Sequence, residues 1–415
     1  VELCAYSPYL SSILTSNPGM SDELMDSLVL DRLPSARWLG EAIAELCEGA
    51  EDLDPILHSF KIDQQLRVGA RDMLGKDDVQ ATTAALSGIA EACLAQIARR
   101  QYDHLVARFG RPTIAGESAD GKPRRAKPCE LILLAMGKLG GREMNYHSDL
   151  DLVFLYEGEG HTAATDGAHQ ETTTNQHFFS ELGQRIINMI ARMNSTGRLY
   201  EVDARLRPTG KSGALATSLA EFDRYFSEGH GKLWERQALC KARVVFASPR
   251  AARLAERAVG RAAFEHQWRD GDAREIREMR RRLEASAAPD DLKRGPGGIV
   301  DIEFVVQMLQ LKHGRRRRDV RRANTLEALS ALGEAGLLAD EDYAAFERSY
   351  RFLRTLEARL RLISVTPQSK LPDEPTELAK LAHLMRYADG ESLLADYRAC
   401  RVENRRRFEK LFGQE

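Results

Sequence analysis

One stretch near the middle of the chain, residues 131–154, restricts the fold more than any other. It begins as an apolar run, is interrupted at Gly137 and again at Gly140 and Gly141, and resumes as Ser148-Asp-Leu-Asp-Leu-Val-Phe154. Short apolar runs bounded by glycine are typical of buried strands. The stretch therefore predicts two buried strands joined by a glycine-containing connection.

The second of these runs carries two carboxylates on one face. Because side chains alternate along a strand, Asp149 and Asp151 point one way, and Leu150 and Leu152 point the other. Two carboxylates at the end of a buried strand repel each other and are costly without a cation between them. Mg²⁺ prefers oxygen ligands and completes its shell with substrate phosphates. The glycine pair upstream offers bare N–H groups to such phosphates. We therefore predict a metal-dependent nucleotide site.

Each piece alone has a simpler interpretation. Asp-x-Asp is common at solvated strand ends, and Gly-Gly is more often a turn than a phosphate cradle. Here the two occur together, separated by seven residues and with a predicted strand on each side. This combination resembles the signature of the DNA-polymerase-β-like nucleotidyltransferase superfamily. The resemblance implies a small mixed sheet with helices and a third carboxylate from a later strand.

Residues 199–208 alternate with period two and predict that later strand. The charged face of the strand consists of Glu201, Asp203, Arg205 and Arg207, and the apolar face of Val202, Ala204 and Leu206. The charged face is compatible with a plain exposed edge. Pairing beside the first two aspartates would instead bring in Asp203 as the third carboxylate. The two arginines could then make bidentate contacts with phosphate oxygens.

The length of 415 residues predicts two or three domains. We expect a helical region over residues 1–113, a nucleotidyltransferase domain over 114–255, and a C-terminal helical bundle over 256–415. The fold class is thus α+β. The bundle is predicted from an apolar stripe on a long helix that begins at Asp340. Asp301 and Glu303, near the start of another predicted helix, either complement its dipole or border the site.

Composition argues against several classes of protein. A net charge of −2 gives no chain-wide attraction to nucleic acid or membrane, and no apolar run reaches about 18 residues. The six cysteines are scattered, which favours buried thiols in a reducing cytosol over disulfides or zinc, and hence a cytoplasmic location. The chain starts at Val1 without a visible signal peptide, so we expect a piece of a longer polypeptide.

The motifs Gly137–Phe154, Tyr200–Pro208 with Ser212-Gly213, and Trp234–Arg243 resemble those of the glutamine-synthetase adenylyltransferase family. Gly295–Phe304 is also similar to a segment found in both halves of that family's enzymes. One half adenylylates a tyrosine of glutamine synthetase, and the other removes the group by phosphorolysis. The residues of these motifs are more similar to those of the C-terminal, adenylylating half.

The resemblance implies a specific site. Two Mg²⁺ ions held by Asp149, Asp151 and Asp203 would bridge the triphosphate of ATP. Asp203 would also help to deprotonate the tyrosine hydroxyl. The predicted nucleotide-binding residues are Lys138, Gly140, Gly141, Ser148, Arg205, Arg207 and Lys211. Glutamine synthetase and the PII signalling protein are the implied partners, with no nucleic acid and no membrane.

Three alternatives stay open. The chain could be the half that removes the adenylyl group by phosphorolysis, releasing ADP. It could be a nucleic-acid nucleotidyltransferase, which would need a basic groove with aromatic platforms, whereas only 7% of the residues are aromatic. It could finally be a non-catalytic scaffold, although the three intact aspartates argue against that interpretation.

Overall fold

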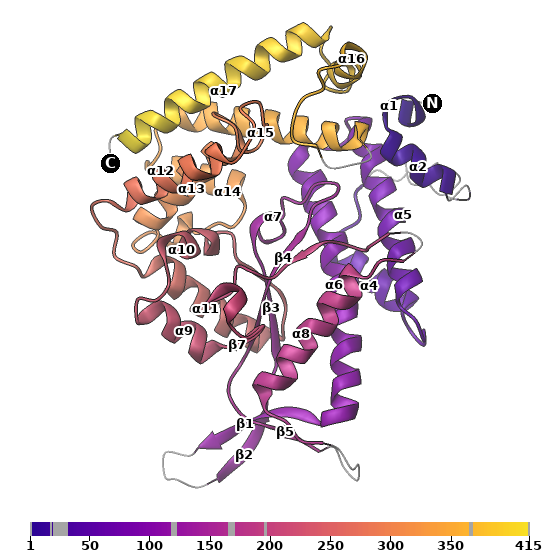
Figure 1. Ribbon diagram of the computed structural model, residues 1–415, viewed down its shortest axis with the longest axis vertical. Helices are drawn as coiled ribbons and strands as arrows, with labels where there is room; N and C mark the ends of the chain where they lie inside the picture. Colours follow the sequence, from indigo (N-terminus) through magenta and orange to yellow (C-terminus); the bar gives the residue numbers. More distant parts are fainter. Residues whose placement is uncertain are drawn as a thin grey trace.

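A computed structural model describes residues 2–16, 19, 32–117, 123–164, 171–194, 197–364 and 368–413. These residues form many helices and two small sheets, one with three strands and one with five (Figure 1). The expected α+β class and the small mixed sheet are confirmed.

The described residues before the first strand form only helices and their connections. The helices are α1 (Glu2–Tyr6), α2 (Pro8–Ser16), α4 (Ala36–Leu46), α5 (Asp54–Met73) and α6 (Val79–Phe109). Asp78 caps α6 by accepting a hydrogen bond from the Ala81 N–H, and Gly110 ends it with a φ of +79°. By length and composition α6 could cross a membrane, but 78% of its apolar window is buried inside the structure. It is therefore a core helix.

The five-stranded sheet is built around the predicted apolar runs. Its strands are β3 (Leu131–Ala135), β4 (Leu150–Tyr156), β6 (Val202–Asp203), β7 (Ala216–Ser218) and β8 (Arg243–Phe246). The order is β6-β4-β3-β8, and β7 also pairs with β4. The β3–β4 and β3–β8 pairs are antiparallel, whereas β6 and β7 run parallel to β4. The second sheet contains β1 (Arg111–Glu117), β2 (Pro123–Pro128) and β5 (Thr162–Ala163).

Helices cover both faces of the larger sheet, which explains why β3 is apolar throughout and β4 is apolar except for Asp151. On one face, Leu152 and Phe154 join an apolar core with the N-terminal helices and α8 (Asn175–Ala191). On the other face, Val153 and Leu155 join a core with the later helices. Figure 1 shows α6 and α8 on one side of β3 and β4, and α9 to α11 on the other.

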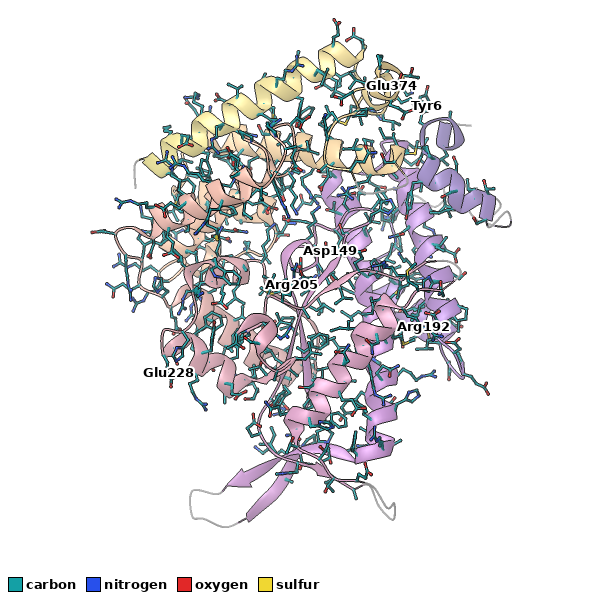
Figure 2. The ribbon with its side chains drawn as sticks, viewed as in Figure 1. Tyr6, Asp149, Arg192, Arg205, Glu228 and Glu374 are labelled. Atoms are coloured by element: carbon teal, nitrogen blue, oxygen red, sulfur yellow. The ribbon has the colours of Figure 1, made fainter. Side chains whose placement is uncertain are left out.

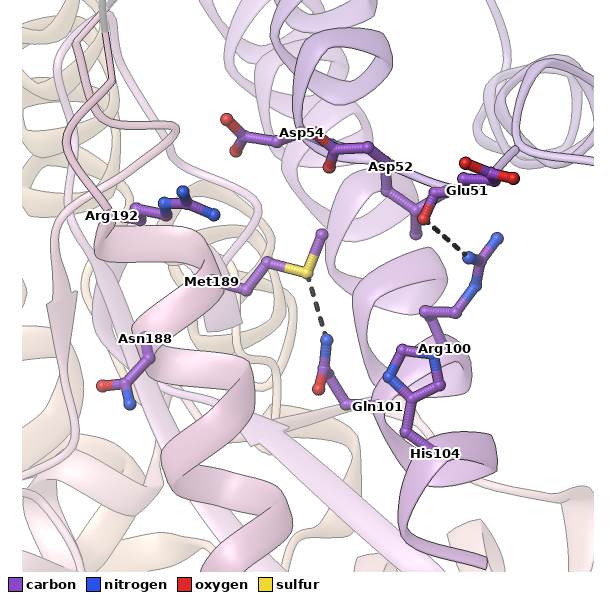
Figure 3. Close-up of a pocket in the computed structure, with 10 residues that line it drawn as sticks. Glu51, Asp52, Asp54, Arg100, Gln101, His104, Asn188, Met189 and Arg192 are labelled. Carbon is purple, nitrogen blue, oxygen red and sulfur yellow. Dashed lines mark hydrogen bonds between the residues drawn. The ribbon is translucent and has the colours of Figure 1, made fainter. Parts of the chain in front are cut away.

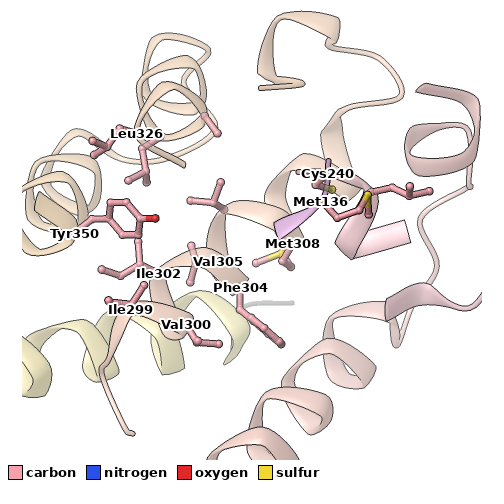
Figure 4. Close-up of a cluster of buried hydrophobic side chains, with 14 of the residues drawn as sticks. Met136, Cys240, Ile299, Val300, Ile302, Phe304, Val305, Met308, Leu326 and Tyr350 are labelled. Atoms are coloured by element: carbon pink, nitrogen blue, oxygen red, sulfur yellow. The ribbon is translucent and has the colours of Figure 1, made fainter. Parts of the chain in front are cut away.

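The later part of the chain is helical. It contains α9 (Leu219–Ser227), α10 (Leu233–Leu239), α11 (Pro249–Phe264), α12 (Asp272–Ala285), α13 (Ile299–His313), α14 (Thr325–Glu334), α15 (Asp340–Ile363), α16 (Pro375–Leu384) and α17 (Gly390–Gly413). Figure 4 shows the apolar face of α13 beside Tyr350 of α15. Met136, which follows β3, belongs to the same core, so the sheet and these helices share one interior.

Two predictions at the level of elements had different outcomes. The apolar stripe on α15 is buried, as expected, from Phe346 to Ile363. The strand predicted over residues 199–208 is wrong in length, because only Val202 and Asp203 pair with β4. The backbone N–H of Arg205 donates to Asp203 Oδ1 at 2.8 Å instead of to a neighbouring strand. That local hydrogen bond turns the chain away from the sheet.

Among the residues that the structure describes, the five cysteines other than Cys4 are free thiols. Cys47, Cys93, Cys129 and Cys240 are buried. The expectation of buried, unpaired thiols is confirmed for these four positions.

Candidate active site

The sheet brings two of the three predicted carboxylates side by side. Asp151 of β4 pairs in register with Asp203 of β6, and Asp149 lies two residues before Asp151 at the start of the strand. The backbone of Gly137 approaches the carboxylate of Asp151 closely. A Cβ atom on Gly137 would lie 2.3 Å from Asp151 Oδ2, and the glycine has a φ of +52°. Only glycine fits this close approach without strain.

The electrostatics of Asp151 reflect this crowding. Burial, and then the charges of Asp149 and Asp203, raise the pKa of Asp151 to about 6, although Lys293 and Arg205 partly oppose the rise. Figure 2 shows Asp149 and Arg205 in the middle of the molecule, where the sheet meets the later helices. Carboxylates that disfavour one another's charge form the kind of ligand set that a divalent cation stabilises.

Asp203 is bound by an arginine in this conformation. Arg205 Nε lies 2.9 Å from Asp203 Oδ1 and 2.8 Å from Oδ2, so the guanidinium contacts both carboxylate oxygens. Within the described residues, no three carboxylate, imidazole or thiol side chains are arranged so that they could hold one ion. The described side chains are therefore not arranged as a three-carboxylate metal site, and the carboxylate of Asp203 is bound to Arg205.

Arg207 takes a different position from Arg205. Arg207 donates to the backbone carbonyl of Ala204 and, at 3.5 Å, to that of Gly213, so its guanidinium binds its own loop. The backbone of Lys211 lies in a short 3-10 helix over Gly210–Ser212. The Lys211 side chain lies outside the described part of the structure. The structure thus gives Arg205 a place at the carboxylates, and Arg207 a place in the neighbouring loop.

The glycine pair has a packing role that the sequence did not reveal. The N–H groups of Gly140 and Gly141 donate to the carbonyls of Met136 and Gly137 at 2.9 and 3.1 Å, within the turn of α7 (Gly137–Gly140). A Cβ atom on Gly140 would lie 1.9 Å from the Lys241 carbonyl oxygen. The prediction that these two N–H groups are bare is wrong, since the turn already uses both donors.

Ser148 and Lys138 hold the connection between β3 and β4 in place. Ser148 Oγ accepts a hydrogen bond from the Asn145 N–H at 2.9 Å and so stabilises the turn before Asp149. Lys138 Nζ donates to Glu357 Oε1 of α15 at 2.7 Å. Burial lowers the pKa of Lys138 to about 8, against the opposing effect of Glu357. Ser148 directly precedes Asp149 in the chain, Lys138 directly follows Gly137, and both side chains already have protein partners.

A buried ion network joins the β3–β4 connection to α13 and was not predicted from the sequence. Lys241 Nζ lies 2.6 Å from Glu143 Oε2 and 2.7 Å from Glu303 Oε1. Burial disfavours the ammonium form of Lys241, but the two carboxylates more than offset this effect and raise its pKa above the usual range. Each residue comes from a different motif quoted above. Lys241 and Glu303 are charged residues within mostly apolar segments, which was the available signal, whereas Glu143 lies in a polar turn that gave none.

Asp301 and Glu303 can now be distinguished. Asp301 is fully buried, where it pairs with Arg280 and accepts a hydrogen bond from the Gly297 N–H at 2.8 Å. It therefore fixes the start of α13. Glu303 instead belongs to the ion network with Lys241 and Glu143. The two acidic residues of this motif have separate structural roles.

A cavity of about 300 Å³ lies elsewhere, among the N-terminal helices and α8. Figure 3 shows Arg100 and His104 of α6 facing Met189 and Arg192 across it. None of the three aspartates lines this cavity. The strongest chemical grouping in the described residues is thus the cluster at the start of β4. It combines carboxylates, the raised pKa of Asp151 and nearby cations.

Two models of known families match successive parts of the chain. The model of the glutamate-ammonia ligase adenylyltransferase family matches residues 1–258. The model described as GlnD PII-uridylyltransferase matches residues 264–412. Residues 259–263, which lie between the two matches, belong to α11 (Pro249–Phe264).

Three relatives carry the name bifunctional glutamine synthetase adenylyltransferase/adenylyl-removing enzyme. The protein from Thioalkalivibrio sulfidiphilus is 31% identical over 420 residues, which cover 100% of this chain and 42% of the relative. The protein from Burkholderia mallei is 33% identical and covers 99% of this chain and 45% of the relative. The protein from Xanthomonas axonopodis pv. citri is 35% identical and covers 81% of this chain and 35% of the relative. The chain therefore spans less than half the length of these relatives.

Proposed function

The chain belongs to the glutamate-ammonia ligase adenylyltransferase family, and on that premise we propose that it transfers AMP from ATP to a tyrosine of glutamine synthetase. The observation that carries the proposal is the register of the sheet. Asp151 and Asp203 are paired across adjacent strands, and Asp149 lies at the same strand end. The fold proposed for this core is that of the polymerase-β-like nucleotidyltransferases.

The donor set at this strand end fits magnesium. Asp149 is exposed, Asp151 has a pKa raised by burial and by its acidic neighbours, and Gly137 leaves the carboxylate of Asp151 without a side chain beside it. Asp149, Asp151 and Asp203 would hold one or two ions once Asp203 exchanges Arg205 for the metal. When bound, Mg²⁺ neutralises charge on the triphosphate and on the leaving group.

The reaction is an in-line displacement at the α-phosphorus. The tyrosine oxygen forms the new bond to phosphorus, and the bond from phosphorus to the bridging oxygen breaks, so that pyrophosphate leaves. Asp203 accepts the proton of the tyrosine hydroxyl, whose pKa near 10 makes it a weak nucleophile unaided. Arg205, released from Asp203, is then free to bind phosphate oxygens through its planar guanidinium.

Two conservative variants test the role of the carboxylates. Asp149→Asn and Asp151→Asn each remove one negative oxygen ligand with little change in volume. Loss of a metal's contribution of several kcal/mol lowers the transfer rate by about 100-fold or more. The measurement is transfer of labelled AMP from ATP to purified glutamine synthetase, with the thermal midpoint as a check on folding. Asp270→Asn, at an exposed position, is the matched control and should keep normal activity.

Normal turnover by both site variants would remove the metal role. Equal losses in the Asp270→Asn control would show that the assay reports charge or stability rather than the site.

The reverse chemistry is the second candidate, because the relatives' printed name includes adenylyl removal. In that reaction, orthophosphate attacks the phosphorus of adenylyl-tyrosine, the bond to the tyrosine oxygen breaks, and ADP is released. Two parallel incubations separate the candidates. One contains ATP and unmodified glutamine synthetase, and the other contains phosphate and the adenylylated form. Product only in the second incubation would replace our first assignment.

The PII signalling protein is the further partner that we propose. Its support is the resemblance of the motifs and the description of the family model that matches residues 264–412. Glutamine synthetase as the protein substrate is supported in the same way by the names of the relatives. Purified PII and glutamine synthetase should each form a complex with this chain in a pull-down or a titration.

A further inference from the structure

The later helices face the carboxylate cluster directly. Along β4, Asp151 points to the same side as Val153 and Leu155, because side chains alternate. Val153 and Leu155 pack in the core that also contains α13 and α15. The C-terminal helices therefore cover the side of the sheet from which the Asp151 carboxylate projects. Whatever binds at Asp151 lies between the sheet and those helices.

Lys293 is one cation on that opposing side. Asp151 of β4, Lys138 of α7, Glu303 of α13 and Glu357 of α15 all lie within electrostatic reach of its ammonium. Its backbone is fixed, since its N–H donates to Asp291 Oδ1 at 2.8 Å and its carbonyl accepts from the Val300 N–H at 3.0 Å. Within the described chain, the half-buried ammonium has no ion pair and donates no hydrogen bond.

The acidic side chains near Lys293 already have other partners. Glu357 pairs with Lys138 and Arg354, and Glu303 pairs with Lys241. Neither carboxylate is left to bind the Lys293 ammonium. Among the described residues, the Lys293 ammonium thus has no counterion of its own, and Asp151 lies within its electrostatic reach.

Arg361, in the last turn of α15, is the second cation. Burial lowers the pKa of Arg361, while Glu357 and then Asp149 oppose that effect, which places Asp149 within its electrostatic reach. Its Nε and Nη1 atoms are buried and have no hydrogen-bond partner. A buried N–H group left unpaired is unfavourable, and native structures rarely tolerate one without a reason.

Other arginines with an unpaired buried nitrogen are held elsewhere by the same side chain. Arg280 pairs with Asp301, Arg359 with Asp72, and Arg407 with Asp342. In the described residues, Arg361 has no such ion pair. Its unpaired donors and its closeness to Asp149 point to a ligand that supplies anionic oxygen atoms.

We propose that Lys293 and Arg361 form an anion subsite for the phosphate groups of the nucleotide. The proposal rests on the proposed function, because it concerns the same site. A triphosphate approaching three aspartates needs cations on more than one side. Asp149 and Asp151 would hold the metal ions that neutralise part of the phosphate charge, and Lys293 and Arg361 would supply further positive charge from the C-terminal part of the chain. The nucleotide then joins the sheet to the C-terminal helices, and Arg361 offers two N–H groups where Lys293 offers a point charge.

Calorimetric titration of the full chain tests this subsite. The ligands are ATP, pyrophosphate and orthophosphate, each with Mg²⁺ and each with EDTA. The variants are Lys293→Met and Arg361→Met, which keep the length and the apolar stem of the side chain. Each should weaken binding of ATP and of pyrophosphate by about 10- to 100-fold, as expected for a lost hydrogen bond to a charged group. The EDTA arm separates these residues from the metal, since their contribution should persist there.

Arg294→Met is the matched control, because Arg294 is exposed and adjacent to Lys293. It should leave ATP affinity within about twofold. Thermal midpoints of all variants show whether they fold, and Arg361→Lys keeps the positive charge if Arg361→Met is unstable. Arg361→Lys should restore most of the ATP affinity. A larger loss for orthophosphate than for ATP would place the acceptor phosphate of the reverse reaction here and overturn the assignment to the nucleotide.

The outcomes also separate this subsite from the proposed function. Unchanged ATP and pyrophosphate affinity in folded Lys293→Met and Arg361→Met overturns the subsite, even if the wild-type chain adenylylates glutamine synthetase. Weakened binding without any transfer by the wild-type chain supports the subsite and removes the proposed reaction. Failure of the wild-type chain to bind ATP or pyrophosphate overturns both.

Discussion

At the scale of single residues, several charges were placed by local chemistry that the sequence does not display. The carboxylates of Asp149 and Asp151 could be predicted, because an alternating strand fixes the side to which they point. The ion pair between Asp203 and Arg205 could not be predicted. Two residues of opposite charge on one strand face give the same sequence pattern whether or not they pair. Lys293 and Arg361 gave no local signal, because only the packing of separate helices brings them to the cluster.

Lys61 provides a residue whose charge opposes folding. Its ammonium donates to the Leu199 carbonyl and lies 4.4 Å from the centre of the Tyr200 ring. Burial lowers the pKa of Lys61 from 10.5 to about 8. Below pH 8 both folded and unfolded chains bind the proton, so the cost is constant. Between pH 8 and 10.5 only the unfolded chain keeps the proton, so this residue's contribution to stability rises with pH.

Lys61→Met should therefore stabilise the protein at pH 7. The expected gain is about 2 kcal/mol, from roughly 3 kcal/mol of relieved burial less about 1 kcal/mol for the lost hydrogen bond. The gain should shrink as pH rises towards 10, which urea unfolding at pH 7 and pH 9.5 measures. Lys127→Met, at an exposed position, should change neither value. A destabilised variant at pH 7 would show that the contacts of the ammonium outweigh its burial.

At the scale of elements, α15 is the connection between the parts of the molecule. Along one helix, Arg359 binds Asp72 of α5, Glu357 binds Lys138 beside the site, and Arg354 donates to the Glu143 carbonyl. The sequence predicted its apolar stripe as the core of a bundle. It could not predict these ionic contacts, because the charged positions on the other faces of the helix have the spacing of an ordinary solvated surface.

Glu357→Gln tests the role of α15. Burial alone would raise the pKa of Glu357, but Lys138 and Arg354 more than offset it and hold that pKa well below its usual range. Removing the charge leaves two buried cations without their partner, which costs about 3–5 kcal/mol. The unfolding midpoint in urea should fall accordingly. Glu347→Gln, on the same helix in a half-exposed pair with Arg351, should cost less than about 1 kcal/mol. Equal effects of the two variants would refute the connecting role.

The elements also show where sequence patterns were sufficient. Two mainly apolar runs predicted β3 and β4, because strands covered on both faces are mostly apolar, and Asp151 is the one charged residue within β4. Alternation over residues 199–208 overestimated β6, because the backbone N–H of Arg205 binds the Asp203 side chain and leaves the sheet. The glycine pair looked the same in sequence whether it cradled a phosphate or packed against the Lys241 carbonyl.

At the scale of the whole molecule, the α+β class and the helical C-terminal part could be predicted, and the interdependence of the parts could not. The matches to two family models suggest two separable units, but Val153 and Leu155 of the sheet share one core with α13 and α15. The Glu143–Lys241–Glu303 network crosses the same boundary. The hydrophobic periodicity of a segment does not indicate which other segment packs in the same core.

A chain ending at residue 263 should therefore fail to fold cooperatively. Removing α13 and α15 exposes apolar residues on one face of the sheet and leaves Lys241 and Glu143 without Glu303. We expect aggregation on size-exclusion chromatography, binding of a hydrophobic dye, and a broad thermal transition compared with the full chain. A monomeric fragment with a sharp transition would show instead that α9 to α11 suffice to cover the sheet.

The ion pair between Arg205 and Asp203 has one more consequence. A guanidinium tethered two residues away serves as a counterion that the polypeptide carries with it, so the crowded acidic corner can assemble before any dissolved ion arrives. An incoming ion then has to displace a resident competitor whose effective concentration is set by the chain itself. Ion affinity at this corner therefore depends on how readily one arginine swings away, and less on the number of carboxylates.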